Sequence, residues 1–162
     1  MALYNALDVS RYVIEYSNQK EYGISNLKLQ KILYFIQAFF LISKENGSPC
    51  FKEKIEAWDF GPVVPEVYRE YKQYGSSDIP TMTSYIEFDE ENIWNSRRKL
   101  YGDHVIAEED AKRINAVVDQ FSRYSATDLV TLTHNQAPWE NAYVPHRNNE
   151  ITKEAIKEYF SS

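Results

Sequence analysis

The chain has 162 residues, a formal net charge of −6 at pH 7 and many aromatic side chains, among them 13 Tyr, 8 Phe and 3 Trp. This length fits one domain with a substantial core, and the wealth of apolar residues argues against disorder over most of the chain. The negative charge argues against unaided nucleic-acid binding, which relies on Lys and Arg to replace phosphate counterions. Cys50 is the only cysteine, which excludes an intrachain disulfide and a cysteine-based zinc site.

The N-terminal segment, MALYNALDVSRYV, has no basic region followed by an apolar block. It therefore shows no signal peptide, and with the single cysteine it predicts a cytoplasmic protein. Apolar residues recur at helical spacing over residues 2–17, which predicts an amphipathic first helix. A polar loop ending at Gly23 follows.

The second predicted helix spans about residues 25–46, with Ser25 as its N-cap and Gly47 as its left-handed terminator. Its middle, ILYFIQAFFLI, has only Gln37 as a polar residue. A helix that is apolar on every side is either buried or in a membrane, and crossing a bilayer takes roughly 20 apolar residues. This run is too short, so we expect a buried central helix and no membrane partner.

Residues 51–60 alternate between apolar and polar, which predicts a short strand with Trp58 on the face opposite Ile55 and Ala57. The following Gly61-Pro62 pair is expected to end that strand. Pro65 suits the first turn of a helix, because its missing N–H is not needed there.

The helix beginning at Pro65 is predicted to end at Gly75 and to carry a tyrosine stripe formed by Tyr68, Tyr71 and Tyr74. Residues 76–101 are the least regular part, with a second short strand expected at 85–89. The basic cluster at 97–99 is interpreted as a solvated loop, since it is too short to indicate a DNA-binding site.

The C-terminal third predicts three helices: one opening at Glu108, one from Ser125 to about His134, and a last one capped by Thr152. Ser125 and Asp128 match a capping box. A short turn is expected at 138–143 and a polar linker at 145–150. The predicted fold is mainly α with a minor β element, a compact domain built around the central helix.

No catalytic, metal-binding or cofactor-binding set is visible, so we do not expect an enzyme. His104, His134 and His146 lie far apart in different predicted elements, and Cys50 beside Phe51 is typical of a small buried hydrophobe. His134 is expected to end a helix or to lie in an aromatic groove near Trp139. A small hydrolase using His134 is kept as an alternative.

Three sequence blocks resemble the Panacea-domain family, the SocA-like antitoxins, which includes phage-associated proteins of the GepA type. The blocks are ISNLKLQKILYFIQAFFL (24–41), IEAWDFGPVVPEVYREYKQYG (55–75) and LTHNQAPWENAY (132–143). The residues that match the family motif are Gln30, Lys31, Tyr34, Phe35, Ala57, Trp58, Gly61, Pro62, Val63, His134 and Trp139.

The resemblance implies an antitoxin of a toxin–antitoxin system that binds and neutralises a protein toxin, encoded by the adjacent gene. One branch of the family implies an alternative, a protease adaptor that delivers the toxin to a cellular protease. The family has a mainly helical fold and no agreed catalytic residues. We expect residues 1–162 to form a single such domain with no added helix-turn-helix segment. The candidate partner-binding residues are Trp58, Phe60, Tyr68, His134 and Trp139.

Overall fold

The computed structural model describes residues 3–81, 84–87, 89–100 and 106–161. The α-helices among them are α1 (Ala6–Gln19), α2 (Asn26–Ser43), α3 (Pro65–Tyr71), α4 (Glu108–Gln120), α5 (Ala126–His134), α6 (Ala137–Ala142) and α7 (Lys153–Ser161). The strands are β1 (Ile55–Trp58), β2 (Gly61–Val63), β3 (Ser84–Glu87), β4 (Arg97–Leu100) and β5 (Glu150–Ile151). The expected fold, mainly α with a minor β element, is confirmed.

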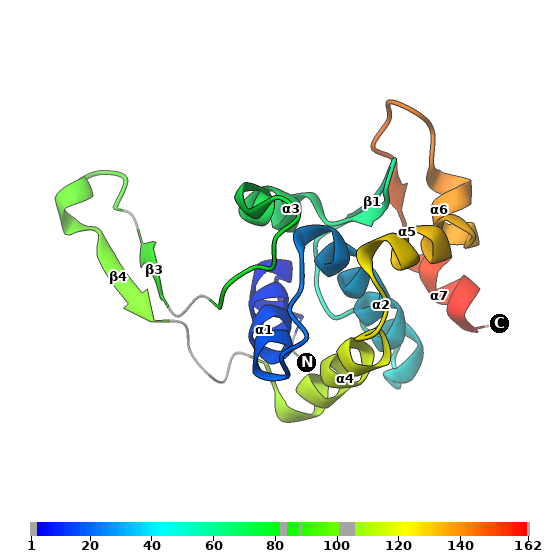
Figure 1. Cartoon of the computed structure of the whole chain (residues 1–162), viewed down its shortest axis with the longest axis horizontal. Coiled ribbons are helices and arrows are strands. Elements are labelled where there is room, and N and C mark those ends of the chain that lie inside the picture. Colours follow the sequence, from blue (N-terminus) through cyan, green and yellow to red (C-terminus); the bar gives the residue numbers. More distant parts are fainter. Residues whose placement is uncertain (1–2, 82–83, 88, 101–105, 162) are drawn as a thin grey trace.

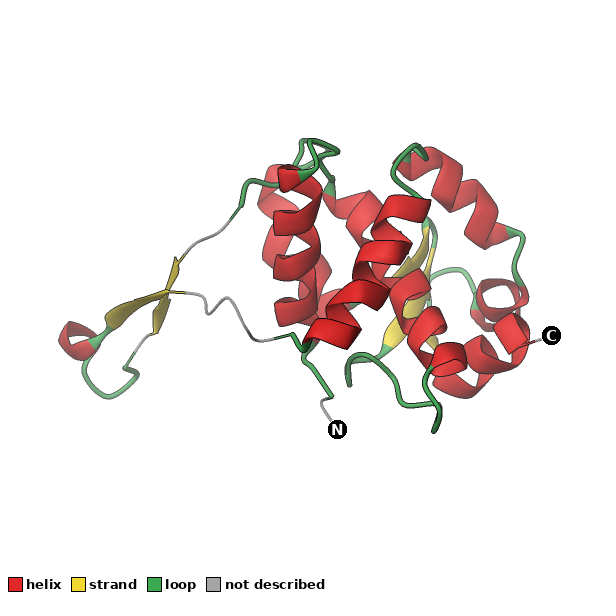
Figure 2. Cartoon of the chain, turned by 90° about the horizontal axis from the view of Figure 1, so that it is seen from below, coloured by secondary structure: helices red, strands yellow, loops and turns green. Residues whose placement is uncertain are grey.

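The helices gather around α2, and a small antiparallel sheet of order β2-β1-β5 covers one end of the body (Figure 1). The antiparallel pair β3–β4 forms a separate hairpin. Two perpendicular views show this hairpin extending away from the helices (Figures 1 and 2).

Helix α2 is the buried central helix that its apolar run predicts. Every residue from 29 to 38 is buried. Ser25 caps the helix as expected, because its hydroxyl accepts a hydrogen bond from the N–H of Lys28 at 3.3 Å. The helix ends at Ser43, three residues short of the predicted end. Gly47 is left-handed, with φ +66°, but it follows a turn and does not terminate the helix directly.

Several polar side chains of α2 are buried together with the apolar ones, and four of them, Gln30, Lys31, Tyr34 and Gln37, bond the segments that build the candidate surface and its surroundings. Burying a polar group without a hydrogen bond is costly, so these bonds favour one position for each partner segment. The four bonds are Gln30 to the N–H of Val64 (2.9 Å), Lys31 to the carbonyl of Pro62 (3.1 Å), Tyr34 to the amide oxygen of Gln136 (2.8 Å) and Gln37 to the N–H of Cys50 (2.7 Å).

The predicted strand over 51–60 is shorter than expected, and the predicted break at Gly61-Pro62 is wrong. The chain turns after β1 and returns as β2, with Trp58 opposite Gly61 in the register. Pro62 fits because β2 is the edge strand of the sheet, where a missing N–H leaves no partner unsatisfied. The alternation is confirmed: Ile55 and Ala57 are buried, and Trp58 on the other face is half-buried.

Gly61 allows the hairpin to approach α2 closely. Its φ of +104° lies in the region that L side chains avoid, and a Cβ there would lie 2.8 Å from Cε of Lys31 and 2.9 Å from Oγ1 of Thr133. The backbone of β2 can therefore reach the Lys31 amine only because residue 61 has no side chain.

The N-terminal prediction needs correction. Helix α1 begins at Ala6, where Asn5 is the N-cap and its side chain accepts from the N–H of Asp8 at 2.8 Å. Tyr4, placed inside the helix by the sequence pattern, forms an isolated bridge with Phe51. The cap and this bridge together prevent the helix from starting at residue 2.

The C-terminal helix starts are confirmed. Helix α4 begins at Glu108, and the reciprocal bonds of the capping box join Ser125 and Asp128. The Thr152 hydroxyl accepts from the N–H of Ala155 at 3.1 Å, as expected of a cap. The predicted linker at 145–150 is only partly right, because Glu150 begins the short strand β5. The turn expected at 138–143 is the short helix α6.

The interpretation of residues 97–99 as a solvated loop is also wrong. Arg97–Leu100 is strand β4, paired with β3 so that Ser84 lies opposite Leu100 and Glu87 opposite Arg97. The strand expected at 85–89 overlaps β3, while Phe88 and His104 lie outside the described residues. Such short strands depend on their cross-strand partners, which a local pattern does not contain.

Replacing Gly61 with alanine should destabilise the fold more than replacing Gly75. Gly75 also has a positive φ, +57°, but no atom lies within 4 Å of the Cβ that an alanine there would carry. Both substitutions strain the backbone, by about 1–3 kcal/mol, and only Gly61→Ala also overlaps Lys31. Urea unfolding should therefore give Gly61→Ala a further loss of about 1–3 kcal/mol. Equal losses in the two variants would contradict the close approach.

Lys31 should make stability rise with pH between pH 7 and 9. Burial lowers the pKa of Lys31 from 10.5 to about 7, so above pH 7 the unfolded chain holds a proton that the folded chain lacks. The free energy of unfolding then increases with pH, by at most about 1.4 kcal/mol per unit. The window closes near pH 9, where the raised pKa of buried Cys50 begins to act in the opposite direction.

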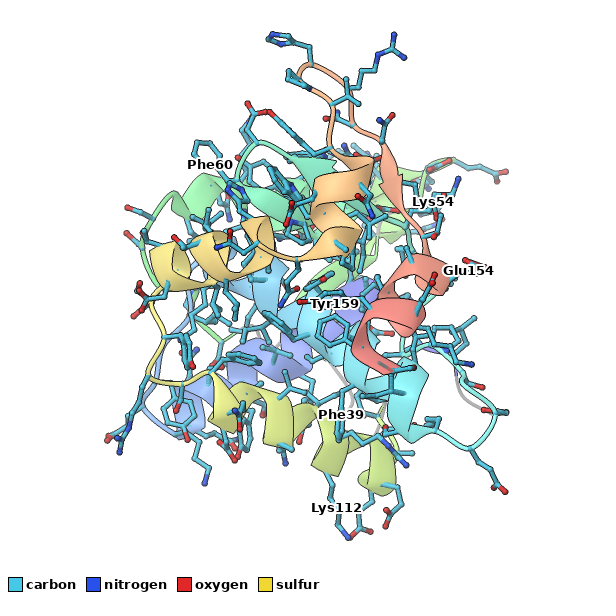
Figure 3. All side chains as sticks on the ribbon, turned by 90° about the vertical axis from the view of Figure 1, so that its right-hand side faces the viewer. Phe39, Lys54, Phe60, Lys112, Glu154 and Tyr159 are labelled. Carbon is cyan, nitrogen blue, oxygen red and sulfur yellow. The ribbon has the colours of Figure 1, made fainter. Side chains whose placement is uncertain are left out.

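Thermal unfolding of wild type and Lys31→Met across this pH window measures the effect. Wild type should gain stability with pH, and Lys31→Met should lack that gain. Lys112→Met is the matched control, because the Lys112 side chain is 65% exposed on α4 (Figure 3). A Lys31→Met variant that keeps the wild-type slope would show that Lys31 is not its source.

Candidate partner-binding surface

The turn between β1 and β2, residues 58–61, is held by α6. The indole N–H of Trp139 donates to the carbonyl of Trp58 at 2.8 Å. The hydroxyl of Tyr143, one helical turn further on, donates to the carboxylate of Asp59. Two side chains from this part of the chain thus fix two successive residues of the turn.

A stack of three rings runs along α5 and α6. His134 is the last residue of α5, and its ring lies on Trp139 with centroids 4.0 Å apart and an interplanar angle of 16°. Trp139 in turn stacks on Tyr143, with centroids 4.5 Å apart at 17°. Stacked rings of this kind add about 0.5–1.5 kcal/mol each beyond the area that they bury. The stack stiffens the support of the turn.

Helix α3 is a second element that contacts the turn. Tyr68 meets Trp58 edge to face, with ring centroids 5.1 Å apart at 65°. The Trp58 indole also donates to Glu56 at 2.9 Å. Trp58 and Tyr68 are both half-buried, so they fix the hairpin against α3 while keeping part of their surface in solvent.

The structure thus brings all five candidate residues around one turn, in different roles. Phe60 stands at the tip of the turn and is 66% exposed (Figure 3). Trp58 and Tyr68 form a wall beside it. His134 and Trp139 are partly buried and support the turn from α5 and α6. Whether any of the five touches a partner remains a prediction.

A cleft of about 290 Å³ lies next to the turn. It combines apolar walls with one carboxylate, Asp59, and one guanidinium, Arg147. Such a cleft suits an apolar side chain flanked by polar groups. The lining residues are Leu27, Trp58, Asp59, Phe60, Val63, Tyr68, His146, Arg147 and Asn148.

Sequence reasoning missed the contribution of residues 146–148, which it assigned to a polar linker. His146 has a left-handed backbone, with φ +64°, and an isolated bridge joins Val144 to Arg147. The chain turns sharply here, and residues 146–148 line the cleft together with residues of the β1–β2 turn. Pro145 followed by polar residues indicates a turn, but it does not indicate which surface that turn will cover.

His134 has no hydrogen bond to a carboxylate or a nucleophile in the described part of the chain. Burial lowers its pKa below the usual 6.5, a hydrogen bond to the backbone of Asp59 opposes that shift, and the nearby Lys31 adds to it. The ring is therefore neutral at pH 7, and its buried Nε2 has no partner among the described residues. Cys50, the other residue considered for a hydrolase, is fully buried. The geometry gives that alternative no support.

Within the described residues, no helix combines the length and the apolarity needed to cross a membrane. The described surface presents a rigid aromatic turn beside a cleft, an arrangement suited to binding another molecule. The described residues thus form a mainly helical domain rich in aromatic contacts.

The chain belongs to the family described as antitoxin SocA-like, Panacea domain, whose pattern it matches over residues 29–140. The resemblance noted in the sequence is thereby confirmed. A curated relative is Antitoxin SocA of Caulobacter vibrioides (strain NA1000 / CB15N). The chain is 32% identical to it over 142 residues, which cover 84% of this chain and 69% of the relative. No solved structure matches the chain.

Replacing Trp139 should destabilise the turn more than replacing Tyr143. Trp139→Phe removes a partly buried hydrogen bond and part of the stack, which predicts a loss of about 1–2 kcal/mol. Tyr143→Phe removes a hydrogen bond at the exposed edge, so we expect it to lower the free energy of unfolding by less than about 0.5 kcal/mol. Urea unfolding of both variants measures this order. A larger loss for Tyr143→Phe would contradict the assigned roles.

Proposed function

We propose that this protein is an antitoxin that neutralises a cognate protein toxin by binding it directly. Membership of the SocA-like family and the name of the curated relative support the antitoxin role. The toxin is proposed to be the product of the adjacent gene. The described residues add a surface suited to such binding, and its physical properties support direct contact.

The exposed ring of Phe60 is the observation that carries the proposal. An exposed aromatic side chain on a fixed turn is a ready anchor for an interface, because aromatic residues dominate binding energies. The turn is already ordered by Trp139, Tyr143 and Tyr68, so binding costs little additional conformational entropy. We propose that Phe60 enters an apolar pocket of the toxin.

The neighbouring cleft supplies the complementary half of the interface. It is proposed to receive an apolar side chain of the toxin, with Trp58 and Tyr68 as its wall. Asp59 and Arg147 at the rim would pair with polar groups around that side chain. His134 and Trp139 act by holding the turn in place.

Co-expression with the product of the adjacent gene tests the proposal. The product alone should stop growth, and growth should return when this protein is present. A product that is harmless alone, or whose toxicity is unchanged by this protein, would refute the antitoxin role.

Toxin abundance in the same cells separates the two routes of neutralisation. Restored growth at constant toxin abundance indicates that binding alone occludes the toxin. Restored growth with faster loss of the toxin indicates the protease-adaptor alternative.

Phe60→Ser should weaken toxin binding at least tenfold while leaving stability within about 0.5 kcal/mol of wild type. The reason is that Phe60 is 66% exposed and makes little contribution to the core. Tyr124→Ser is the matched control, an exposed aromatic residue on another part of the surface, at 41% exposure. Titration calorimetry with purified toxin and thermal unfolding measure the two effects. Unchanged affinity in Phe60→Ser would remove Phe60 from the interface.

Trp58→Ala is a less selective test than Phe60→Ser. Trp58 packs on Tyr68 and donates to Glu56, so its removal should lower both stability and toxin binding. Full unfolding of this variant would place Trp58 among the core residues.

A further inference from the structure

The tip of the β3–β4 hairpin, residues 89–97, exposes two large apolar side chains side by side in the sequence. Trp94 is 87% exposed, the highest value among the large apolar residues that the structure describes, and Ile93 is 63% exposed. Burying such side chains against a partner is favourable, and neighbouring exposed apolar residues are typical of interaction sites. The hairpin itself extends away from the helices (Figures 1 and 2).

The tip has an ordered backbone that its own polar residues maintain. The Asp89 carboxylate accepts from the N–H groups of Glu91 and Asn92, at 3.0 and 3.1 Å. The Asn92 side chain then accepts from the N–H of Trp94 at 3.1 Å, which caps a short 3-10 turn over Ile93–Asn95. The N–H of Asp89 donates to the Ser96 hydroxyl at 3.0 Å and closes the loop. These bonds fix the turn before any partner arrives.

The charges next to Trp94 indicate the chemistry of that partner. Asp89, Glu90 and Glu91 precede the turn and Arg97 follows it, and Glu90, Glu91 and Arg97 are exposed. With three carboxylates and one guanidinium, residues 89–97 carry a net negative charge, so the apolar pair complements an apolar pocket bordered by Lys or Arg. A second copy of this chain fits less well, because each copy carries a net charge of −6.

We propose that the hairpin tip is a second contact with the toxin, in which Trp94 and Ile93 enter an apolar pocket bordered by basic residues. This inference rests on the proposed antitoxin function and adds a contact separate from the Phe60 turn. The carboxylates of the tip guide the two proteins together, and the Trp94 ring supplies most of the affinity of this contact.

The experiment measures binding of variants of this chain to the purified product of the adjacent gene. Trp94→Ser should raise the dissociation constant by about 30-fold or more, as expected for a tryptophan hot spot. The control is Tyr159→Ser on α7, which is 38% exposed on the face turned away from the hairpin (Figure 3). The control should bind like wild type. Thermal unfolding should show both variants folded, because both positions are exposed.

Charge reversal at the tip tests separately whether its carboxylates speed the association of the two proteins. Glu90→Lys combined with Glu91→Lys should slow association about tenfold at low ionic strength, and the difference should shrink as salt is added. Unchanged association rates would overturn the proposed role of the carboxylates.

The other outcomes are distinguishable. If wild type does not bind the gene product, the antitoxin proposal fails and this inference fails with it. If wild type binds and folded Trp94→Ser binds equally well, only the inference is overturned. If Trp94→Ser instead dissociates a wild-type oligomer in analytical ultracentrifugation and binds toxin normally, the tip contacts a second copy and the inference is also overturned.

Discussion

The hydrogen bond from Lys31 to the Pro62 carbonyl is the constraint on which the candidate surface depends. A fully buried amine needs a hydrogen-bond partner, since leaving it without one costs several kcal/mol. The β1–β2 hairpin must therefore return over α2 at a fixed distance, which only a glycine at position 61 permits. This contact lies beneath the turn and determines where the turn exposes Phe60.

The same face of α2 also places the opposite side of the surface. Tyr34 lies one helical turn after Lys31, and its hydroxyl bonds Gln136 in the connection between α5 and α6. That bond fixes His134 and Trp139 on either side of the connection, so that Trp139 reaches the Trp58 carbonyl. Networks of buried polar groups specify a single arrangement more sharply than apolar packing does. One helix face thus sets the relative position of the elements that meet at the turn.

Local signals predicted much of the helical frame, because they act within a few residues. The apolar run of α2, the Ser25 cap and the Ser125–Asp128 capping box are of this kind. Strands β2, β4 and β5 were missed or misplaced because their stability comes from partners far along the chain. Asp110 shows the same limit, because it lies in the acidic first turn of α4 yet is buried and bonds both Tyr4 and Lys44. The five candidate residues come together around one turn only in the tertiary structure, so local sequence patterns did not predict their proximity.

The buried residues of the family motif and the two exposed residues proposed to anchor the toxin have different physical environments. Lys31, Gly61 and Pro62 are buried, and a change at any of them disturbs the core. Phe60 and Trp94 are exposed, lie outside that motif and are held by backbone geometry that their own side chains do not create. Their chemistry can therefore change without loss of the fold, which is the property that a binding domain needs if one framework is to fit different partners. Residues 56–75, which include the paired residues of β1 and β2 and helix α3, form the framework that holds Phe60 in place.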